Sequence, residues 1–387
     1  YDITAWSLPV AFGVESYWTS GAPAGGELVR LPDEAQARAP SAERGATGAR
    51  RSALGAARPP EPLAVAVPGG VAGGQRAQSA YLFEPARNGS SRLAYHLVDR
   101  GYAVAVSAEP LEAGGRAWPR GTFVVRVGRN DSTLHGAIDR LARESGVEVA
   151  AVNTAFATTA QFGTGAGGIA SLARPNVAIV ADEGVSQPAY GALWWSFERR
   201  YGMKFTPVTL GRLRGGDLAR YNVVIVPDAD PGVLASRIGK EGAEALKRWV
   251  QAGGTLVTMA GASAWAARED VGLTSSRVVG SDTAGAAEAA LAALTGIASP
   301  TAASGPAGVP GANFDVALDR THWLTFGYTR PRLTVLFEGD NFLKLSQEGA
   351  NVAVFPAAGA FRRAGFVWDD NTERLLRGTA LLVDEPL

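Results

Sequence analysis

Apolar runs alternate with helical patterns between Pro175 and Ala262, and this alternation constrains the fold more than any other feature of the sequence. Two helical patterns occur there: one has Pro188 near its start and Gly202 just past its end, and the other, 240–252, stops at a glycine pair. Short connections between alternating strands and helices predict a parallel sheet with helices on both faces. The extended runs with the composition of buried strands are 176–181, 204–210, 222–228 and 255–260.

The remaining segments differ from this stretch in composition. Between 63 and 160, five strand-like runs accompany two amphipathic helices, 90–100 and one that Ser132 caps and Gly146 ends, so a smaller α/β domain is expected. Short extended runs near the end of the chain predict a β-rich part that completes the parallel sheet or flanks it. In chain order we expect an extended segment packing on a neighbour (1–31), a linker (32–62), a small α/β domain (63–160), a glycine-rich connector (161–174), a parallel-sheet domain (175–297) and a β-rich extension (298–387).

Charge and cysteine content exclude several classes of function. Lys and Arg number 37, as do Asp and Glu, so the net charge of zero gives no general attraction to nucleic acid or to an anionic membrane. No apolar run approaches the roughly 20 residues that a membrane-spanning helix requires. The absence of cysteine excludes disulfides, thiolate metal sites and a cysteine nucleophile.

A cluster of glycines, Gly163-Thr-Gly-Ala-Gly-Gly168, has the composition of a phosphate-binding loop. A dinucleotide-binding loop requires a strand before the glycines and a helix directly after them. Here a strand is expected next, across Arg174-Pro175, so phosphate binding is not predicted at this position.

The three histidines do not form a metal motif. Zinc hydrolases commonly use closely spaced His and carboxylate ligands, and His96, His135 and His322 occur in neither a His-x-x-Glu nor a His-x-x-x-His pattern. The first two lie in helical patterns and are expected to be ordinary surface or hydrogen-bonded histidines. We expect His322 to be a loop imidazole hydrogen-bonded to backbone.

Polar side chains follow three strands of the predicted parallel sheet. In such sheets ligands bind beyond the carboxyl ends of the strands, which makes these loops the candidate site for a sugar, a cation or a peptide amine. The alternative is that the aspartates only turn the chain or cap helices, and this structural role is favoured. The serine lacks a Gly-x-Ser-x-Gly elbow and has no histidine near it in sequence, which argues against a serine hydrolase. The candidate ligand-binding residues are Asp182, Glu183, Asp228, Asp230 and Ser263.

The central stretch resembles a class I glutamine amidotransferase-like domain, a flavodoxin-like fold. The resemblance rests on Asn222-Val-Val-Ile-Val-Pro-Asp228 and on the run from Gly242 to Val257. In active members of that family, the nucleophile is a cysteine at the sharp turn that follows the equivalent of the last strand. Here that turn is Ala260-Gly261-Ala262, so the resemblance implies the scaffold without its amide hydrolysis.

A longer part of the chain resembles the region that follows the catalytic domain in large bacterial proteins of the M14 zinc carboxypeptidase family. The matching stretches are Tyr1-Asp-Ile-Thr-Ala-Trp-Ser-Leu-Pro9, Tyr81-Leu-Phe-Glu-Pro85, the run from Gly114 to Gly128, and the central unit. In that family a His-x-x-Glu pair and a later His hold the zinc, and a Glu is the general base. None of those motifs occurs here, so no catalytic or metal residue is carried over. The resemblance implies an exported, periplasmic or outer-envelope protein with a zinc-containing peptidase domain upstream in the same polypeptide.

Three functional hypotheses follow. The first is a non-catalytic accessory region that packs on, positions or extends an M14-like peptidase domain, with this chain forming a piece of a longer polypeptide. The second is a binding or scaffold module for a carbohydrate, a peptide or a larger envelope assembly. The third, ranked last, is a hydrolase with an unrecognised site. Candidate contact residues are Trp6, Trp18, Trp194 and Trp195, although a buried core is the expected place for each pair.

Overall fold

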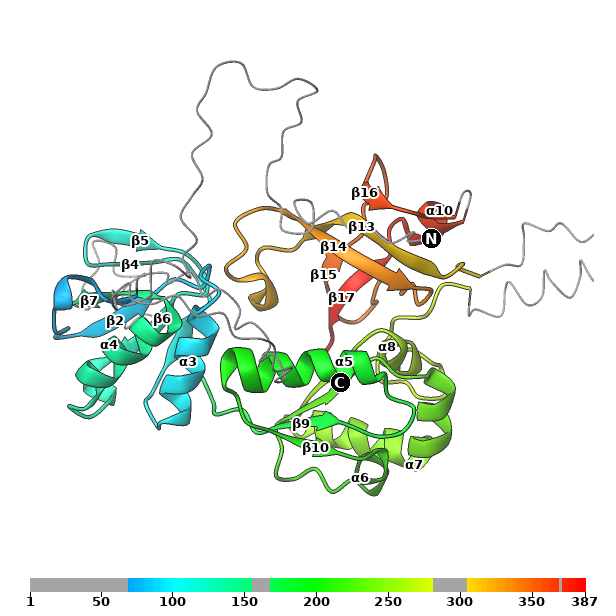
Figure 1. Cartoon of the computed structure of the whole chain (residues 1–387), viewed down its shortest axis with the longest axis horizontal. Helices are drawn as coiled ribbons and strands as arrows, with labels where there is room; N and C mark the ends of the chain where they lie inside the picture. Colours follow the sequence, from blue (N-terminus) through cyan, green and yellow to red (C-terminus); the bar gives the residue numbers. More distant parts are fainter. Residues whose placement is uncertain (1–68, 155–167, 281–304, 369–370) are drawn as a thin grey trace, which may run out of the picture. The chain divides into compact units, whose positions relative to one another are not determined.

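The computed structural model describes residues 69–154, 168–280, 305–368 and 371–387, and these form an α/β protein (Figure 1). Three main sheets follow one another along the chain: the first is mixed, the second is parallel and the third is antiparallel. The predicted α/β class is therefore confirmed. The segments predicted for 1–31 and 32–62, with Trp6 and Trp18, lie outside the described residues.

The first sheet is mixed and has six strands in the order β1-β7-β2-β6-β3-β8. Helices α3 (Ser90–Asp99) and α4 (Leu134–Ser145) cover one face, and a hairpin of β4 (Leu111–Ala113) and β5 (Arg116–Trp118) covers the other (Figure 1). Two short 3₁₀ turns, η1 (Ala72–Gly74) and η2 (Val127–Arg129), complete this part. The strands are β1 (Gly70–Val71), β2 (Ala80–Phe83), β3 (Ala105–Ser107), β6 (Phe123–Arg126), β7 (Glu148–Val152) and β8 (Ile169–Ser171).

Strand β2 shows why this sheet is covered on both faces. Tyr81 and Phe83 pack among the side chains of α3 and α4, whereas Ala80 and Leu82 pack against the hairpin, and all four are buried. Side chains that alternate along a strand thus fill two cores. Strand β8 corrects one expectation, because it lies inside the predicted connector and pairs antiparallel with β3. Three residues are too few to show a strand period.

The second sheet is parallel throughout, with strand order β10-β9-β11-β12. Its strands are β9 (Val177–Val180), β10 (Phe205–Val208), β11 (Val223–Val226) and β12 (Thr255–Thr258). All four side chains of β9 are buried, as expected for a strand covered on both faces. The predicted parallel sheet is therefore confirmed.

Helices cover the two faces of this sheet unequally. Helix α5 (Gln187–Trp194), continued by the π-helix η3 (Trp195–Tyr201), lies on one face, and α6 (Leu210–Gly215) and α7 (Pro231–Gln251) lie on the other (Figure 1). A short α8 (Gly261–Ala266) follows β12 and adds Trp265 to the core on the side of α7. On the face of α5, Val257 and Met259 at the end of the sheet stay exposed.

Helix α7 begins nine residues before the predicted start at Lys240. Pro231 occupies its first turn, and the Asp230 side chain caps it by accepting a hydrogen bond from the backbone N–H of Val233. Gly239 interrupts it with a φ of 67°. The prediction was wrong here because this glycine separates two shorter helical patterns, of which only the second was recognised.

The C-terminal part is a curled antiparallel sheet with the order β14-β13-β15-β17 and with β16 also paired to β13. Among the described residues, none of its strands pairs with the parallel sheet, so it does not complete that sheet. Its core is aromatic, because Phe314 packs against Phe337, Phe355 and Phe361. The elements are β13 (Val309–Leu318), η4 (Trp323–Thr325), β14 (Arg332–Gly339), β15 (Ala350–Val354), β16 (Arg362–Gly365), α10 (Thr372–Leu376) and β17 (Ala380–Asp384).

A half-buried carboxylate ties the segment after α8 to this antiparallel sheet. Glu385 accepts hydrogen bonds from the Thr274 hydroxyl and the Ser275 amide, both at 2.6 Å, and from the Ser346 hydroxyl at 2.9 Å. Burial by itself raises the pKa of Glu385, but these donors outweigh burial and hold the pKa below its ordinary value.

We expect Glu385→Gln to lower the free energy of unfolding at pH 7 by about 1.5–3 kcal/mol, the range for a hydrogen bond to a charged group. Because the folded-state pKa is depressed, the stabilisation is present above the unfolded pKa of about 4.3 and is lost as the pH falls through the folded value. Urea denaturation between pH 3 and 7 measures both effects. A variant that matches the parent protein at pH 7 would contradict this role for Glu385.

Candidate functional site

The candidate site lies at the carboxyl edge of the parallel sheet, where the loops after β9, β11 and β12 meet. These three strands are neighbours in the order β9-β11-β12, so the sheet brings the predicted residues to one edge. Asp182 and Glu183 follow β9, Asp228 and Asp230 follow β11, and Ser263 lies in α8 after β12.

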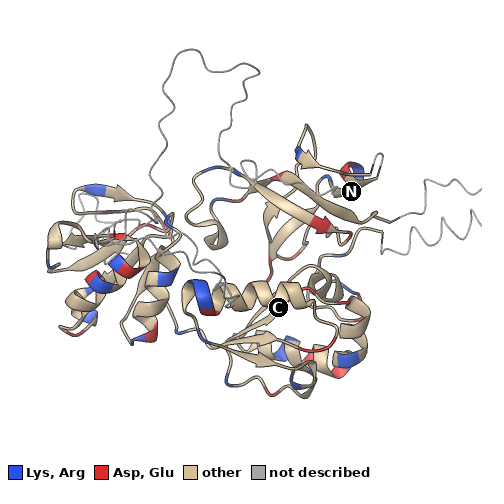
Figure 2. Cartoon of the chain, viewed as in Figure 1, with Lys and Arg blue, Asp and Glu red and all other residues tan. Residues whose placement is uncertain are grey.

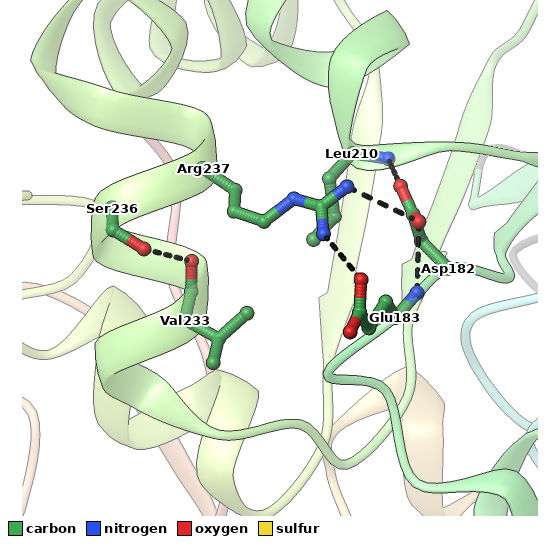
Figure 3. Close-up of polar contacts among 6 residues, drawn as sticks. All are labelled: Asp182, Glu183, Leu210, Val233, Ser236 and Arg237. Carbon is green, nitrogen blue, oxygen red and sulfur yellow. Dashed lines mark hydrogen bonds and ion pairs between the residues drawn. The ribbon is translucent and has the colours of Figure 1, made fainter.

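Asp182 holds the loop after β9 (Figure 3). Its Oδ2 accepts the backbone N–H of Leu210 at 2.9 Å, and its Oδ1 accepts the N–H of Glu183 at 2.8 Å. Burial by itself raises the pKa of Asp182, but these amides and the guanidinium of Arg237 outweigh it and lower the pKa. The carboxylate is thus engaged in fixing two loops of the chain.

Arg237 is the residue of this edge that the sequence did not reveal. Its guanidinium lies 3.4 Å from carboxylate oxygens of both Asp182 and Glu183 and so spans the loop after β9 (Figure 3). It belongs to the first half of α7, the part that the predicted helix omitted. In the same turn the Ser236 hydroxyl donates to the carbonyl of Val233.

The two aspartates after β11 also bond to backbone. Asp230 caps α7, as described above, and Asp228 accepts the N–H of Gly261 through its Oδ1 at 3.0 Å. The second bond joins the loop after β11 to the first residue of α8. Four of the predicted residues therefore meet around the sheet edge, and three of their carboxylates accept hydrogen bonds from main-chain N–H groups. The fourth, Glu183, has a side chain that is 90% exposed and lies beside Arg237.

The turn from β12 into α8 is strained at Ala260. Its φ of 47° and ψ of −116° make it the non-glycine residue with positive φ among the described residues. An L-residue in this region costs about 1–3 kcal/mol. The neighbouring position admits no side chain, because a Cβ on Gly261 would lie 2.2 Å from the carbonyl oxygen of Ala229.

Ser263 and the histidines do not combine into a nucleophilic pair in the described structure. The Ser263 hydroxyl lies 3.0 Å from the hydroxyl of Thr258, and His135 Nδ1 lies 2.7 Å from the Tyr81 hydroxyl in the first sheet. The expected backbone bond of His322 is confirmed, since its Nδ1 accepts the N–H of Leu324 at 3.3 Å.

His322 also has a partner that the sequence did not indicate. Its Nε2 lies 3.0 Å from Oδ2 of Asp384, and the indole Nε1 of Trp323 donates to the same oxygen at 3.0 Å. Because Asp384 ends β17 and follows the other two by about 60 residues, no local pattern links them. With Nδ1 accepting from backbone, the ring carries its proton on Nε2 and donates it to Asp384.

The described ranges contain no group of three or more His, Asp or Glu side chains that could hold one metal ion. Positively and negatively charged residues occur together on several helices, for example as blue and red segments of α4 and α7 in Figure 2. None of the described helices is both long and apolar enough to cross a membrane.

Trp194 and Trp195 correct the expectation of a buried pair. They are 39% and 45% exposed, at the junction of α5 with the π-helix. The face of this helix that packs on the sheet is occupied by Tyr190, Leu193 and Phe197 instead. Helical spacing therefore leaves the two indoles outside the core.

Comparison with known proteins does not place this chain in a family. No family model, no curated protein and no solved structure matches it.

We expect Ala260→Gly to raise the free energy of unfolding by about 1 kcal/mol, because glycine adopts positive φ without strain. The matched control is Ala245→Gly within helix α7, where the same chemical change lowers stability by about 1 kcal/mol. Urea denaturation of both variants measures the difference. Equal losses in the two variants would contradict strain at residue 260.

Asp182→Asn is expected to lower the free energy of unfolding at pH 7 by about 1–2 kcal/mol, because the amide offers one acceptor where two backbone donors point. Glu183→Gln removes the other partner of Arg237 but lies exposed, so its effect stays within about 0.5 kcal/mol. The folded pKa of Asp182 is lowered, so the Asn effect is present above the unfolded pKa of about 3.9 and fades below it. Chemical denaturation at pH 3 and pH 7 tests this; equal effects of the two variants would refute it.

Proposed function

We propose that this chain is a non-catalytic accessory region of a protein similar to M14 zinc carboxypeptidases. Its parallel-sheet domain would be a glutamine amidotransferase-like scaffold of flavodoxin type that serves packing, positioning or partner binding. The observation that carries the proposal is Ala260. A methyl group occupies the strained position between strand and helix at which that family places its nucleophile.

The strand order supports the scaffold. Counted along the chain, β10-β9-β11-β12 is the order 2-1-3-4, which is how flavodoxin-like sheets begin. In such sheets the carboxyl edge carries the reactive groups. Here that edge keeps the tight turn, with Gly261 pressed against Ala229, while the turn residue itself has no atom that can attack a carbonyl.

The polar groups beside the turn support a structural role as well. Asp182, Asp228 and Asp230 are each hydrogen-bonded to main-chain N–H groups, and the pKa of Asp182 is lowered rather than raised. A general acid at neutral pH requires a raised carboxyl pKa. Asp182 does not meet this requirement, and the hydrogen bonds of all three carboxylates hold loops in place.

The proposal that the chain belongs to a longer, M14-like protein rests on the resemblance of several stretches of its sequence to that family. On that basis the polypeptide carries a zinc peptidase domain upstream of Tyr1 and is exported, to the periplasm or outer envelope of a bacterium. The zinc would belong to that upstream domain, since the described part of this chain has no suitable ligand group.

A second function, binding of a carbohydrate or peptide, is favoured by one observation. Trp194 and Trp195 present adjacent exposed indoles at the junction of α5 with a π-helix, and irregular helical turns of this kind occur often at functional sites. Flat aromatic surfaces bind sugar rings and peptide side chains by stacking. In this reading the domain is a ligand-binding or scaffold module.

One set of measurements separates these functions. The gene region preceding the codon for Tyr1 is expected to encode a His-x-x-Glu motif, and the purified chain is expected to hydrolyse peptide and amide substrates no faster than buffer. Turnover that Asp228→Ala or Ser263→Ala abolishes would overturn the non-catalytic assignment. Quenching of tryptophan fluorescence by oligosaccharides or peptides, lost in Trp194→Ala, would favour the binding module over a purely positioning role.

A further inference from the structure

The turn between β2 and α3 contains the one Asn-Gly dipeptide of the sequence, Asn88-Gly89. Every other asparagine precedes a residue that carries a side chain. The peptide nitrogen after an asparagine can attack the side-chain amide of that asparagine, because the two groups are spaced to close a five-membered ring. A Cβ on the following residue crowds and stiffens this approach, so glycine is the residue that permits it most readily.

The side chain of Asn88 is both accessible and unrestrained. It is exposed, and within the described residues no hydrogen bond holds it. In contrast, the side-chain amides of Asn130, Asn351 and Asn371 each accept a main-chain N–H and donate to a main-chain carbonyl. A carboxamide fixed in this way cannot rotate towards the next peptide nitrogen, whereas the carboxamide of Asn88 can.

The attacking nitrogen is unengaged as well. In the described part of the chain the backbone N–H of Gly89 donates to no acceptor, as is usual for a residue at the start of a helix. The groups around it belong to the turn and to α3: the N–H of Ser90 donates to the carbonyl of Arg87, and the N–H of Leu93 donates to the carbonyl of Gly89. Loss of the Gly89 proton therefore breaks no hydrogen bond of the fold.

We propose that Asn88 is a site of spontaneous deamidation and that its isoaspartyl product loosens the start of α3. Base removes the proton from the Gly89 nitrogen, which then forms a bond to Cγ of Asn88. The bond from Cγ to Nδ2 breaks, and Nδ2 takes up a proton and leaves as ammonia. Water then opens the resulting succinimide at either of its carbonyls, which gives aspartate or isoaspartate, and no group is oxidised or reduced. This inference is independent of the proposed function, because it concerns the first sheet and its helices.

The two products act differently on α3. Aspartate places a negative charge beside the start of this helix, which has no acidic residue in its first turn and no side-chain cap, and such a charge is favourable there. Isoaspartate instead lengthens the main chain by a methylene group directly before Gly89. A Cβ on Gly89 would lie 1.9 Å from the carbonyl oxygen of Ser145 at the end of α4, so the main chain has no room to move towards α4. The first residues of α3 must then take up the added length.

Incubation of the full chain in mildly alkaline buffer made with heavy-oxygen water tests the modification. Peptide mapping by mass spectrometry is expected to show the exchange of the Asn88 amide for heavy oxygen. This exchange should be roughly tenfold faster than at Asn130, Asn351 and Asn371, whose amides are held away from the attacking geometry. The matched control is Asn88→Gln, which keeps the amide but requires a larger ring, and it is expected to lose the reaction at residue 88. Conversion of Asn88 no faster than that of the other asparagines, or only after unfolding in urea, would overturn the proposal.

Hydrogen exchange tests the structural consequence. The isoaspartyl form is separated by chromatography and compared with the Asn88→Asp variant, which has the charge without the longer main chain. The amides of 93–96 in α3 are expected to exchange roughly tenfold faster in the isoaspartyl form, with those of 255–258 in β12 unchanged. Equal exchange of 93–96 in the two proteins would refute the loosening of α3.

Discussion

The constraint on which the central domain depends is that the inner strands of a parallel sheet are covered on both faces. Strand β9 buries all four of its side chains, two into the core beneath α6 and α7 and two beneath α5. The connections must therefore place helices on both faces, and all four strands then end at the same edge. The loops after β9, β11 and β12 meet because the sheet is parallel, without any attraction between their side chains. Proximity at this edge is thus weak evidence of a site until the bonds of each side chain are known.

Those hydrogen bonds show that the acidic residues stabilise the fold. Main-chain N–H groups at loop ends and at the start of a helix require acceptors, and Asp182, Asp228 and Asp230 supply them. Asp182 accepts two amides and has a lowered pKa, so this carboxylate stays charged near neutral pH. Arg237 completes this arrangement by pairing with both carboxylates of the loop after β9. Aspartates after the strands of a parallel sheet suggest a ligand site when only the sequence is known. The same aspartates are also the acceptors that the main-chain N–H groups of the loops require.

The parts of the fold that a sequence predicts are those set by local periodicity. Strands β9, β11 and β12 and helix α3 were predicted to within a few residues because each is a continuous pattern ended by glycine or a polar loop. The start of α7 was missed because Gly239 divides it, and Arg237 was missed with it. Strand β8 and the contact of His322 with Asp384 depend on partners far along the chain, so no local signal marks them. The exposure of Trp194 and Trp195 follows from which face of α5 meets the sheet, and composition does not specify that face.

Strain at Ala260 links the architecture to the proposed loss of chemistry. A backbone conformation that costs about 1–3 kcal/mol persists only where its surroundings fix it. Here Asp228 holds the N–H of Gly261, and the carbonyl of Ala229 lies so close that residue 261 has no room for a Cβ. The turn is therefore imposed by the loop after β11, whatever side chain residue 260 carries. A nucleophile at this position would be presented by the same geometry, but the geometry does not need one. Packing and main-chain hydrogen bonds are thus sufficient to hold the strained turn.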